Sequence, residues 1–164
     1  MSSTRHTPEQ ADGERRTDHR PRRESRHQAR EAAVQMLYQW EIGKQSMLEV
    51  MQTYWPPGGL ISDLPLSDEL RQFATTLTNG VAATVEQLDP IIAEAAQNWR
   101  LERMAVMDRI ILRLAVYEFL HQPETPGRVI INEALELART FSTDDAVRFI
   151  NGMLDGIRRT LARE

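Results

Sequence analysis

The sequence of 164 residues contains no cysteine. That absence excludes disulfides, thiolate metal sites, iron–sulfur clusters and cysteine nucleophiles, and it predicts a protein of the reducing cytoplasm. No stretch approaches the roughly 18 consecutive apolar residues of a membrane span, and the polar N-terminus lacks the apolar segment of a signal peptide. Glycine-rich phosphate loops, Gly-x-Ser-x-Gly elbows and His-Glu-x-x-His pairs are missing too. We therefore expect a binding protein and no enzyme, with no catalytic residues, no metal and no cofactor.

Lysine is almost as scarce as cysteine, because Lys44 is the only one in the chain. The formal net charge of −4 by itself argues against a nucleic-acid partner, but the charge is uneven. Residues 15–30 hold seven arginines against two acidic residues, a local charge of +5, whereas residues 31–164 hold 12 basic and 19 acidic residues. Guanidinium groups form bidentate contacts with phosphate and stack on bases. Residues 1–21 are expected to be a disordered basic arm, for which a solvated tail and a nucleic-acid-binding segment are both left open.

Apolar residues repeat at helical spacing from about residue 24 onward, and no run alternates in the manner of a strand. Ser67 is a good N-cap for a long helix, and Asp89 followed by Pro90 predicts the start of another. Residues 104–121 are apolar around most of the helix circumference, so this helix is expected to be central and buried. The expected helices cover about residues 24–43, 46–55, 67–88, 91–99, 104–121, 131–138 and 144–161. The fold class is therefore all-α, with about seven helices.

Few side chains on these helices carry recognisable chemistry. Glu133 and Glu136 have a spacing compatible with metal binding, but no histidine accompanies them, so a solvated face is the expectation. His27 lies beside the basic arm. Gly152 and Gly156 are four residues apart in the last helix, where each costs about 1 kcal/mol relative to alanine. This cost suggests that another helix or a ligand comes close to them.

Four segments together are typical of one family. They are REAAVQMLYQW at residues 30–40, DRIILRLAVYE at 108–118, VIINEALELA at 129–138 and FINGMLD at 149–155. In order and spacing they closely resemble the bacterial transcription antitermination factor NusB family, from about residue 26 to residue 157. The resemblance implies two packed bundles of three to four helices. We expect an all-helical RNA-binding domain at residues 22–164, with sub-bundles at about 22–88 and 89–164.

The resemblance also implies a function. NusB-like proteins pair with NusE, a ribosomal protein of the small subunit that doubles as an elongation factor, and the pair binds the boxA element of nascent RNA. This assembly helps RNA polymerase to read through terminators in ribosomal RNA operons. The expected partners are single-stranded boxA RNA, NusE and the RNA polymerase elongation complex, with no membrane partner. A homodimer is left open.

The expected RNA-binding residues follow from the family motifs. The arginine-rich start of the family falls on Arg26 and Arg30, with His27 and Gln28 where the family often has more arginine. Arg20, Arg22 and Arg23 would compensate from upstream.

A second motif precedes the last helix. Residues 141–149, FSTDDAVRF, stand where the family commonly has Phe-Gly-x-Glu-Asp-Ser-His-Lys-Phe. Asp145 and Phe149 match the positions that touch RNA. The departures are Ser142, Ala146 and Val147.

The resemblance places Tyr38 and Asp108 at positions that meet the ribosomal protein. For the RNA residues it implies a division of labour: guanidinium groups attract phosphates, a ring such as Phe149 stacks on a splayed base, and a carboxylate such as Asp145 accepts from exocyclic amines. The acidic body would complement a basic ribosomal protein.

Two other functions compete with this interpretation. The same helical domain occurs at the N-terminus of ribosomal RNA 5-methylcytosine methyltransferases, so the chain could be the RNA-positioning module of an enzyme. The sequence ends about seven residues after the resemblance, without a cofactor-binding domain or a cysteine nucleophile, which favours the first interpretation. The third is a helical scaffold that uses the same surfaces only for self-association.

Overall fold

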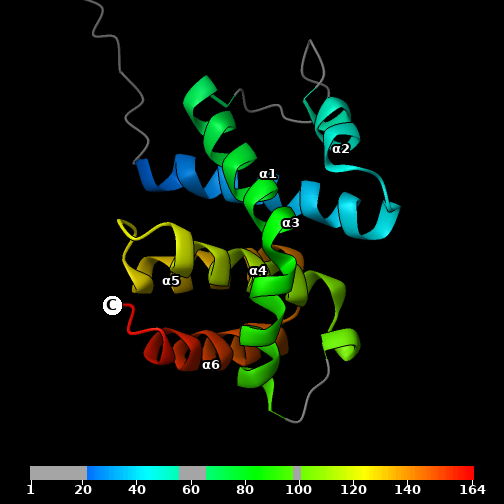
Figure 1. The fold of residues 1–164 in the computed structure, drawn as a ribbon. Helices are drawn as coiled ribbons and strands as arrows, with labels where there is room; N and C mark the ends of the chain where they lie inside the picture. The colour runs from blue at the N-terminus through cyan, green and yellow to red at the C-terminus, as the bar shows by residue number, and fades with distance from the viewer. Residues whose placement is uncertain (1–21, 56–65, 98–100) are drawn as a thin grey trace, which may run out of the picture.

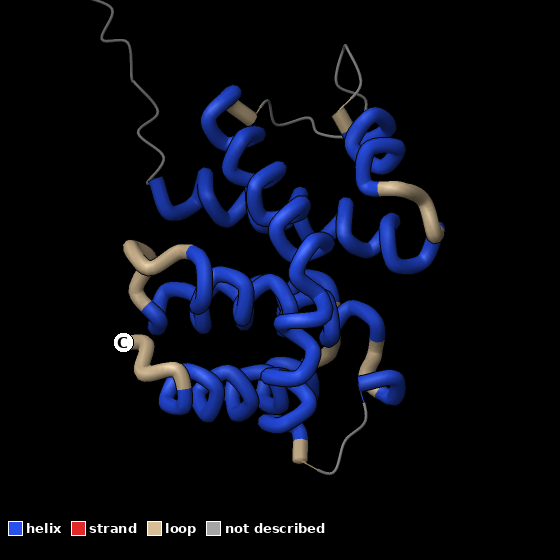
Figure 2. Tube along the Cα trace, viewed as in Figure 1, coloured by secondary structure: helices blue, strands red, loops and turns tan. Residues whose placement is uncertain are grey.

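The computed structural model describes residues 22–55, 66–97 and 101–164, and side chains from residue 26 onward. The described chain is helical and holds no strand (Figures 1 and 2). Its elements are α1 (Arg22–Gly43), α2 (Met47–Tyr54), α3 (Asp68–Ala96), the short 3-10 helix η1 (Leu101–Arg103), α4 (Val106–His121), α5 (Gly127–Phe141) and α6 (Asp144–Thr160). The all-α prediction is confirmed. The expected arm at residues 1–21 lies outside the described residues.

Two packed clusters hold the helices together. The smaller one joins α1, α2 and the start of α3 through Ala29, Ala32, Met36, Val50, Tyr54 and Ala74. The larger one draws on α1, α3, α4, α5 and α6. Because α4 contacts each of the other helices of this larger cluster, it is the central helix of the fold, as its apolar circumference predicted. Every residue from Ile110 to Phe119 is buried.

The expected helix start at Asp89 and Pro90 is wrong, because α3 runs through both residues without ending. Asp89 does not cap a helix. Its two carboxylate oxygens accept from Nε and Nη2 of Arg113 on α4, each at 2.8 Å. The irregularity in α3 lies earlier, at Thr84, whose hydroxyl donates to the carbonyl of Gly80 at 2.6 Å. Such bonding to the preceding turn bends helices. The expected sub-bundle boundary at residues 88 and 89 therefore falls inside α3.

A glycine permits the close packing of α3 on α4. A Cβ atom at Gly80 would lie 2.2 Å from the ring of Tyr117. Tyr117 is 8% exposed, so its ring has little room to move. Gly80 is therefore required where these two helices meet.

Candidate nucleic-acid interface

The start of α1 carries the first group of expected RNA contacts. Arg22 and Arg23 lie in α1, but their side chains are outside the described part of the structure. Arg26 is exposed, and its guanidinium lies 5.3 Å from the ring centroid of Phe73 on α3. A cation over an aromatic face is held in place while its outer edge stays in water. Arg26 thus remains available to a phosphate.

Arg30 does not fit the role expected for it. Its side chain is 2% exposed, and its Nε and Nη2 donate to the carboxylate of Glu118 on α4 at 2.7 to 3.2 Å. Glu118 is equally buried. A guanidinium that is sealed from solvent and bonded in this bidentate manner is not available to phosphate. The structure gives Arg30 the role of joining α1 to α4.

His27 also points into the protein. Its Nδ1 lies 2.6 Å from Oε2 of Glu133 on α5, and its Nε2 lies 3.0 Å from Oε1 of Glu31, one turn further along α1. The hydrogen bond with Glu133 raises the pKa of His27, against the opposing effect of burial. Glu133 is 3% exposed, so the expectation of a solvated face is wrong for this residue. Its nearest described basic partner comes from a different helix, which sequence spacing does not reveal.

The junction of α5 and α6 carries the second group of expected RNA contacts, Asp145 and Phe149. The hydroxyl of Thr143 accepts from the backbone N–H of Ala146 at 3.1 Å, which fixes the start of α6. Asp145 is exposed in the first turn of α6, and Phe149 is half-buried one turn later, against the main core. Ser142, a departure from the family motif, donates to Oδ1 of Asp108 at 2.5 Å. Asp108 is therefore tied to the junction that carries Asp145.

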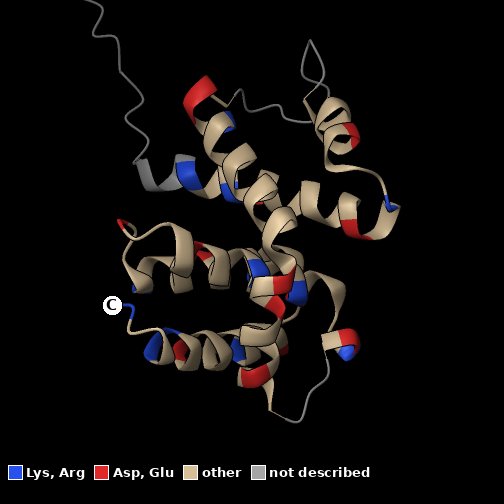
Figure 3. Cartoon of the chain, in the orientation of Figure 1, with Lys and Arg blue, Asp and Glu red and all other residues tan. Residues whose placement is uncertain are grey.

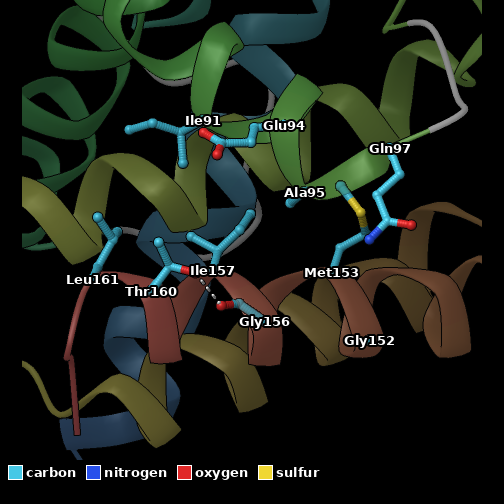
Figure 4. Close-up of a pocket in the computed structure, with 10 residues that line it drawn as sticks. All are labelled: Ile91, Glu94, Ala95, Gln97, Gly152, Met153, Gly156, Ile157, Thr160 and Leu161. Atoms are coloured by element: carbon cyan, nitrogen blue, oxygen red, sulfur yellow. Dashed lines mark hydrogen bonds between the residues drawn. The ribbon is translucent and has the colours of Figure 1, made fainter.

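A groove runs along α6 from this junction. One part, of about 500 Å³, lies between the end of α3 and α6 (Figure 4). It is lined by Ile91, Glu94, Ala95, Gln97, Gly152, Met153, Gly156, Ile157, Thr160 and Leu161. An adjoining part shares four of these residues and reaches Arg148 and Phe149. Phe149 thus lines an open groove between helices.

The two glycines of α6 form part of that groove. No atom of the described residues lies within 4 Å of a Cβ placed on Gly152 or Gly156. The expectation that another helix of this chain approaches them is therefore wrong for the described structure. The alternative expectation, that a ligand comes close to these two glycines, stays a prediction. Gln97, which closes α3 with a positive φ of 53°, extends toward the Gly152 end of the groove (Figure 4).

The expected protein-partner residues lie on adjacent helices. Tyr38 on α1 is 42% exposed, and Asp108 on α4 is half-buried. Next to Asp108, Arg109 donates to Glu41 of α1 at 2.8 Å, which joins the two helices close to both candidates. Ile42 is 52% exposed one turn beyond Tyr38, so the end of α1 presents apolar surface.

The charges of the described helices are of both signs, with basic residues at the start of α1 (Figure 3). In residues 22–55, 66–97 and 101–164, no group of three or more acidic or histidine side chains could hold a metal ion. The helices searched in these ranges are too short or too polar to cross a membrane.

The sequence did not predict the roles that three residues play in these sites. Phe73 lies under Arg26, Glu133 pairs with His27, and Gln97 borders the groove. The sequence contained a signal for Phe73 alone, because this aromatic residue lies in the apolar stripe of α3. The other two are placed by the packing of helices that lie far apart in the sequence.

Comparison with known proteins agrees with this geometry. The family model described as "NusB family" matches residues 27–159. The transcription antitermination protein NusB of Koribacter versatilis is 44% identical over 140 residues, 85% of this chain and 92% of that protein. The solved structure of T. maritima NusB has a TM-score of 0.71 at 29% identity and covers 85% of this chain and 92% of that one. A chain from a complex of NusB and NusE with double-stranded RNA has the same fold, with a TM-score of 0.66, 24% identity and coverage of 84% and 98%. The chain belongs to the NusB family of transcription antitermination proteins.

Proposed function

We propose that this protein binds the boxA element of nascent ribosomal RNA operon transcripts together with NusE, and that the assembly promotes read-through of terminators by RNA polymerase in the cytoplasm. The observation that carries the proposal is the placement of Phe149. Its ring borders an open groove beside Arg148 and Gln97 and lies one turn from the exposed carboxylate of Asp145. Aromatic faces and hydrogen-bonding groups at the edge of a groove are typical of single-stranded RNA sites.

Two kinds of contact would divide the work. Arg26, with Arg22 and Arg23, would attract phosphates in a manner that tolerates any sequence. Phe149 would stack on an unpaired base, and Asp145 would accept from an exocyclic amine, which favours bases that carry one. Affinity would come from the first group and sequence preference from the second. Arg30 is left out of the RNA contacts because it is buried against Glu118.

NusE would bind beside the RNA. Tyr38 and Asp108 lie on helices that the ion pair of Arg109 with Glu41 joins, and Asp108 is also bonded to the α5–α6 junction. A partner seated on these residues would therefore lie next to the RNA groove. A basic ribosomal protein would add cations and contact surface to the acidic part of this chain.

The test is a titration of boxA RNA with Phe149→Ala and Arg26→Ala at several salt concentrations. Phe149→Ala should weaken binding by about 1 to 3 kcal/mol and leave the salt dependence unchanged, because stacking releases no counterions. Arg26→Ala should weaken boxA and unrelated RNA alike and lower the log–log salt slope by about 0.7. Arg139→Ala is the matched control, since Arg139 is an exposed arginine paired with Glu136 on α5.

Thermal melts separate recognition from packing. Phe149 packs against the main core, so its truncation would also destabilise the protein. If folded Phe149→Ala binds boxA as tightly as the parent, the ring belongs to the core alone and the proposed groove is not the RNA site. Light scattering with and without RNA tests the self-association alternative in the same samples.

A further inference from the structure

The exposed arginine at the start of α1 is held by an aromatic ring and not by a carboxylate. The guanidinium of Arg26 lies 5.3 Å from the centroid of the Phe73 ring on α3. Within residues 26–55, 66–97 and 101–164, this guanidinium forms no ion pair and no hydrogen bond. Arg139 on α5 is different, because it is exposed as well but donates to the carboxylate of Glu136. Arg26 is thus in contact with the protein while its charge stays uncompensated.

The kind of partner decides what an arginine can do for RNA. A carboxylate neutralises the guanidinium and occupies the same N–H donors that phosphate needs. An aromatic face attracts the cation through its quadrupole, has no net charge and leaves the N–H donors at the edge of the guanidinium free. Arg30 shows the contrast, because its guanidinium lies 5.4 Å from the centroid of the same ring but donates to Glu118.

The ring of Phe73 is itself held in place. Phe73 lies in the second turn of α3, whose start is fixed by the Ser67 hydroxyl, which accepts from the N–H of Leu70 at 3.3 Å. The ring is half-buried and packs against both hydrophobic clusters. It therefore cannot turn away from α1 without losing packing contacts, and it offers Arg26 a rigid surface.

We propose that Phe73 is a positioning residue of the RNA site, whose ring orders the guanidinium of Arg26 for a phosphate before RNA arrives. The proposal rests on the proposed RNA-binding function. An arginine that moves freely in the unbound protein loses rotamer freedom on binding, whereas one that is already ordered on a ring loses less. This difference corresponds to about two- to tenfold in affinity for one side chain. Because the ring acts through a phosphate contact, the gain should not depend on the RNA sequence.

The experiment is a double-mutant cycle in the full chain, with the affinity for boxA RNA and for an unrelated single-stranded RNA measured on folded protein. Phe73→Leu keeps an apolar side chain and removes the ring, so it should weaken both RNAs about two- to tenfold. In the Arg26→Ala background the same replacement should have no further effect, because the arginine that the ring positions is gone. Phe73→Tyr keeps the aromatic face and should bind as the parent does. Trp55→Leu is the matched control: it removes the ring that lies 5.2 Å from the guanidinium of Arg71, and it should leave RNA affinity unchanged.

Three results would overturn the proposal. The first is parental RNA affinity in Phe73→Leu. The second is an equal loss from Phe73→Leu with and without Arg26, which would mean that the ring acts independently of this arginine. The third is a loss for boxA alone, which would mean that the ring itself contacts a base.

Absence of RNA binding by the parent would count against the proposed function instead. The contact between Arg26 and Phe73 is then tested by NMR in the free protein. The side-chain protons of Arg26 should show an upfield ring-current shift that disappears in Phe73→Leu. A parent without this shift would show that the ring does not order Arg26.

Discussion

Replacing Arg30 decides whether this arginine serves RNA or the fold. Its guanidinium and the carboxylate of Glu118 are each 2% exposed and share three hydrogen-bond contacts of 2.7 to 3.2 Å. Arg30→Leu removes the cation and leaves the carboxylate of Glu118 buried without it. The second carboxylate, Glu133, loses a positive neighbour at 3.9 Å.

The magnitude follows from the asymmetry of buried ion pairs. Removing one partner costs about 3 to 5 kcal/mol, because the remaining charge stays desolvated. Replacing both partners by apolar residues of similar volume is often neutral. Arg30→Leu should therefore lower the free energy of unfolding by about 3 to 5 kcal/mol, and Arg30→Leu with Glu118→Leu should recover most of that loss.

Urea unfolding of the two single variants and the double variant measures this coupling, and RNA titration under folding conditions measures binding. The folded fraction of the double variant should bind RNA with the parent's salt slope, since Arg30 does not contact phosphate. The reasoning is refuted if Arg30→Leu costs less than about 1 kcal/mol of stability while the salt slope falls by the roughly 0.7 of a lost phosphate contact. Arg26→Ala serves as the reference variant, because it should show the fall in salt slope that accompanies a lost phosphate contact.

Three further predictions use the same methods. Gly80→Ala should destabilise the protein by about 1 to 3 kcal/mol in urea, because its Cβ would overlap the ring of Tyr117; a stabilised variant would show that the ring moves aside freely. Gly156→Ala should instead stabilise it by about 1 kcal/mol, since no atom of the described residues lies within 4 Å of the new Cβ, and a loss of stability would contradict the open groove. Asp108→Arg should weaken NusE binding by about 1 to 3 kcal/mol in calorimetry, whereas Ser142→Ala, which removes only the hydrogen bond to Asp108, should weaken it less; equal affinities in folded protein would remove Asp108 from the interface.

The sequence predicted the helices better than their tertiary contacts. The apolar periodicity predicted both the position of α4 and its burial, because a helix that is apolar around most of its circumference is stable only when other helices cover it. Asp89 and Pro90 gave a false helix start, since the carboxylate of Asp89 can either cap a helix or pair with an arginine, and here it pairs with Arg113. Only the packing of α3 against α4 distinguishes these alternatives.

The candidate site shows the same limit. The family motif pointed to Arg26 and Arg30 alike, and both are arginines at the start of one helix. They lie one turn apart on the same face of α1, and both guanidinium groups lie over the ring of Phe73. Arg30 is one turn further along the helix, where Glu118 of α4 meets and buries it, whereas Arg26 stays exposed. His27 and Glu133 are 106 residues apart, so no local pattern joins them. Phe149 was placed correctly on its helix, but its groove depends on Gln97 at the end of α3.

Cooperative binding of RNA and NusE is the sharpest test of the proposed function. The measurement is the affinity of this protein for a boxA RNA and for a scrambled RNA of the same composition, alone and with the NusE ribosomal protein. We predict that boxA binds more tightly than the scrambled RNA and that NusE increases this difference, because the proposed sites for RNA and for NusE adjoin at the α5–α6 junction. Equal affinity for the two RNAs in folded protein, with no gain from NusE, would contradict it.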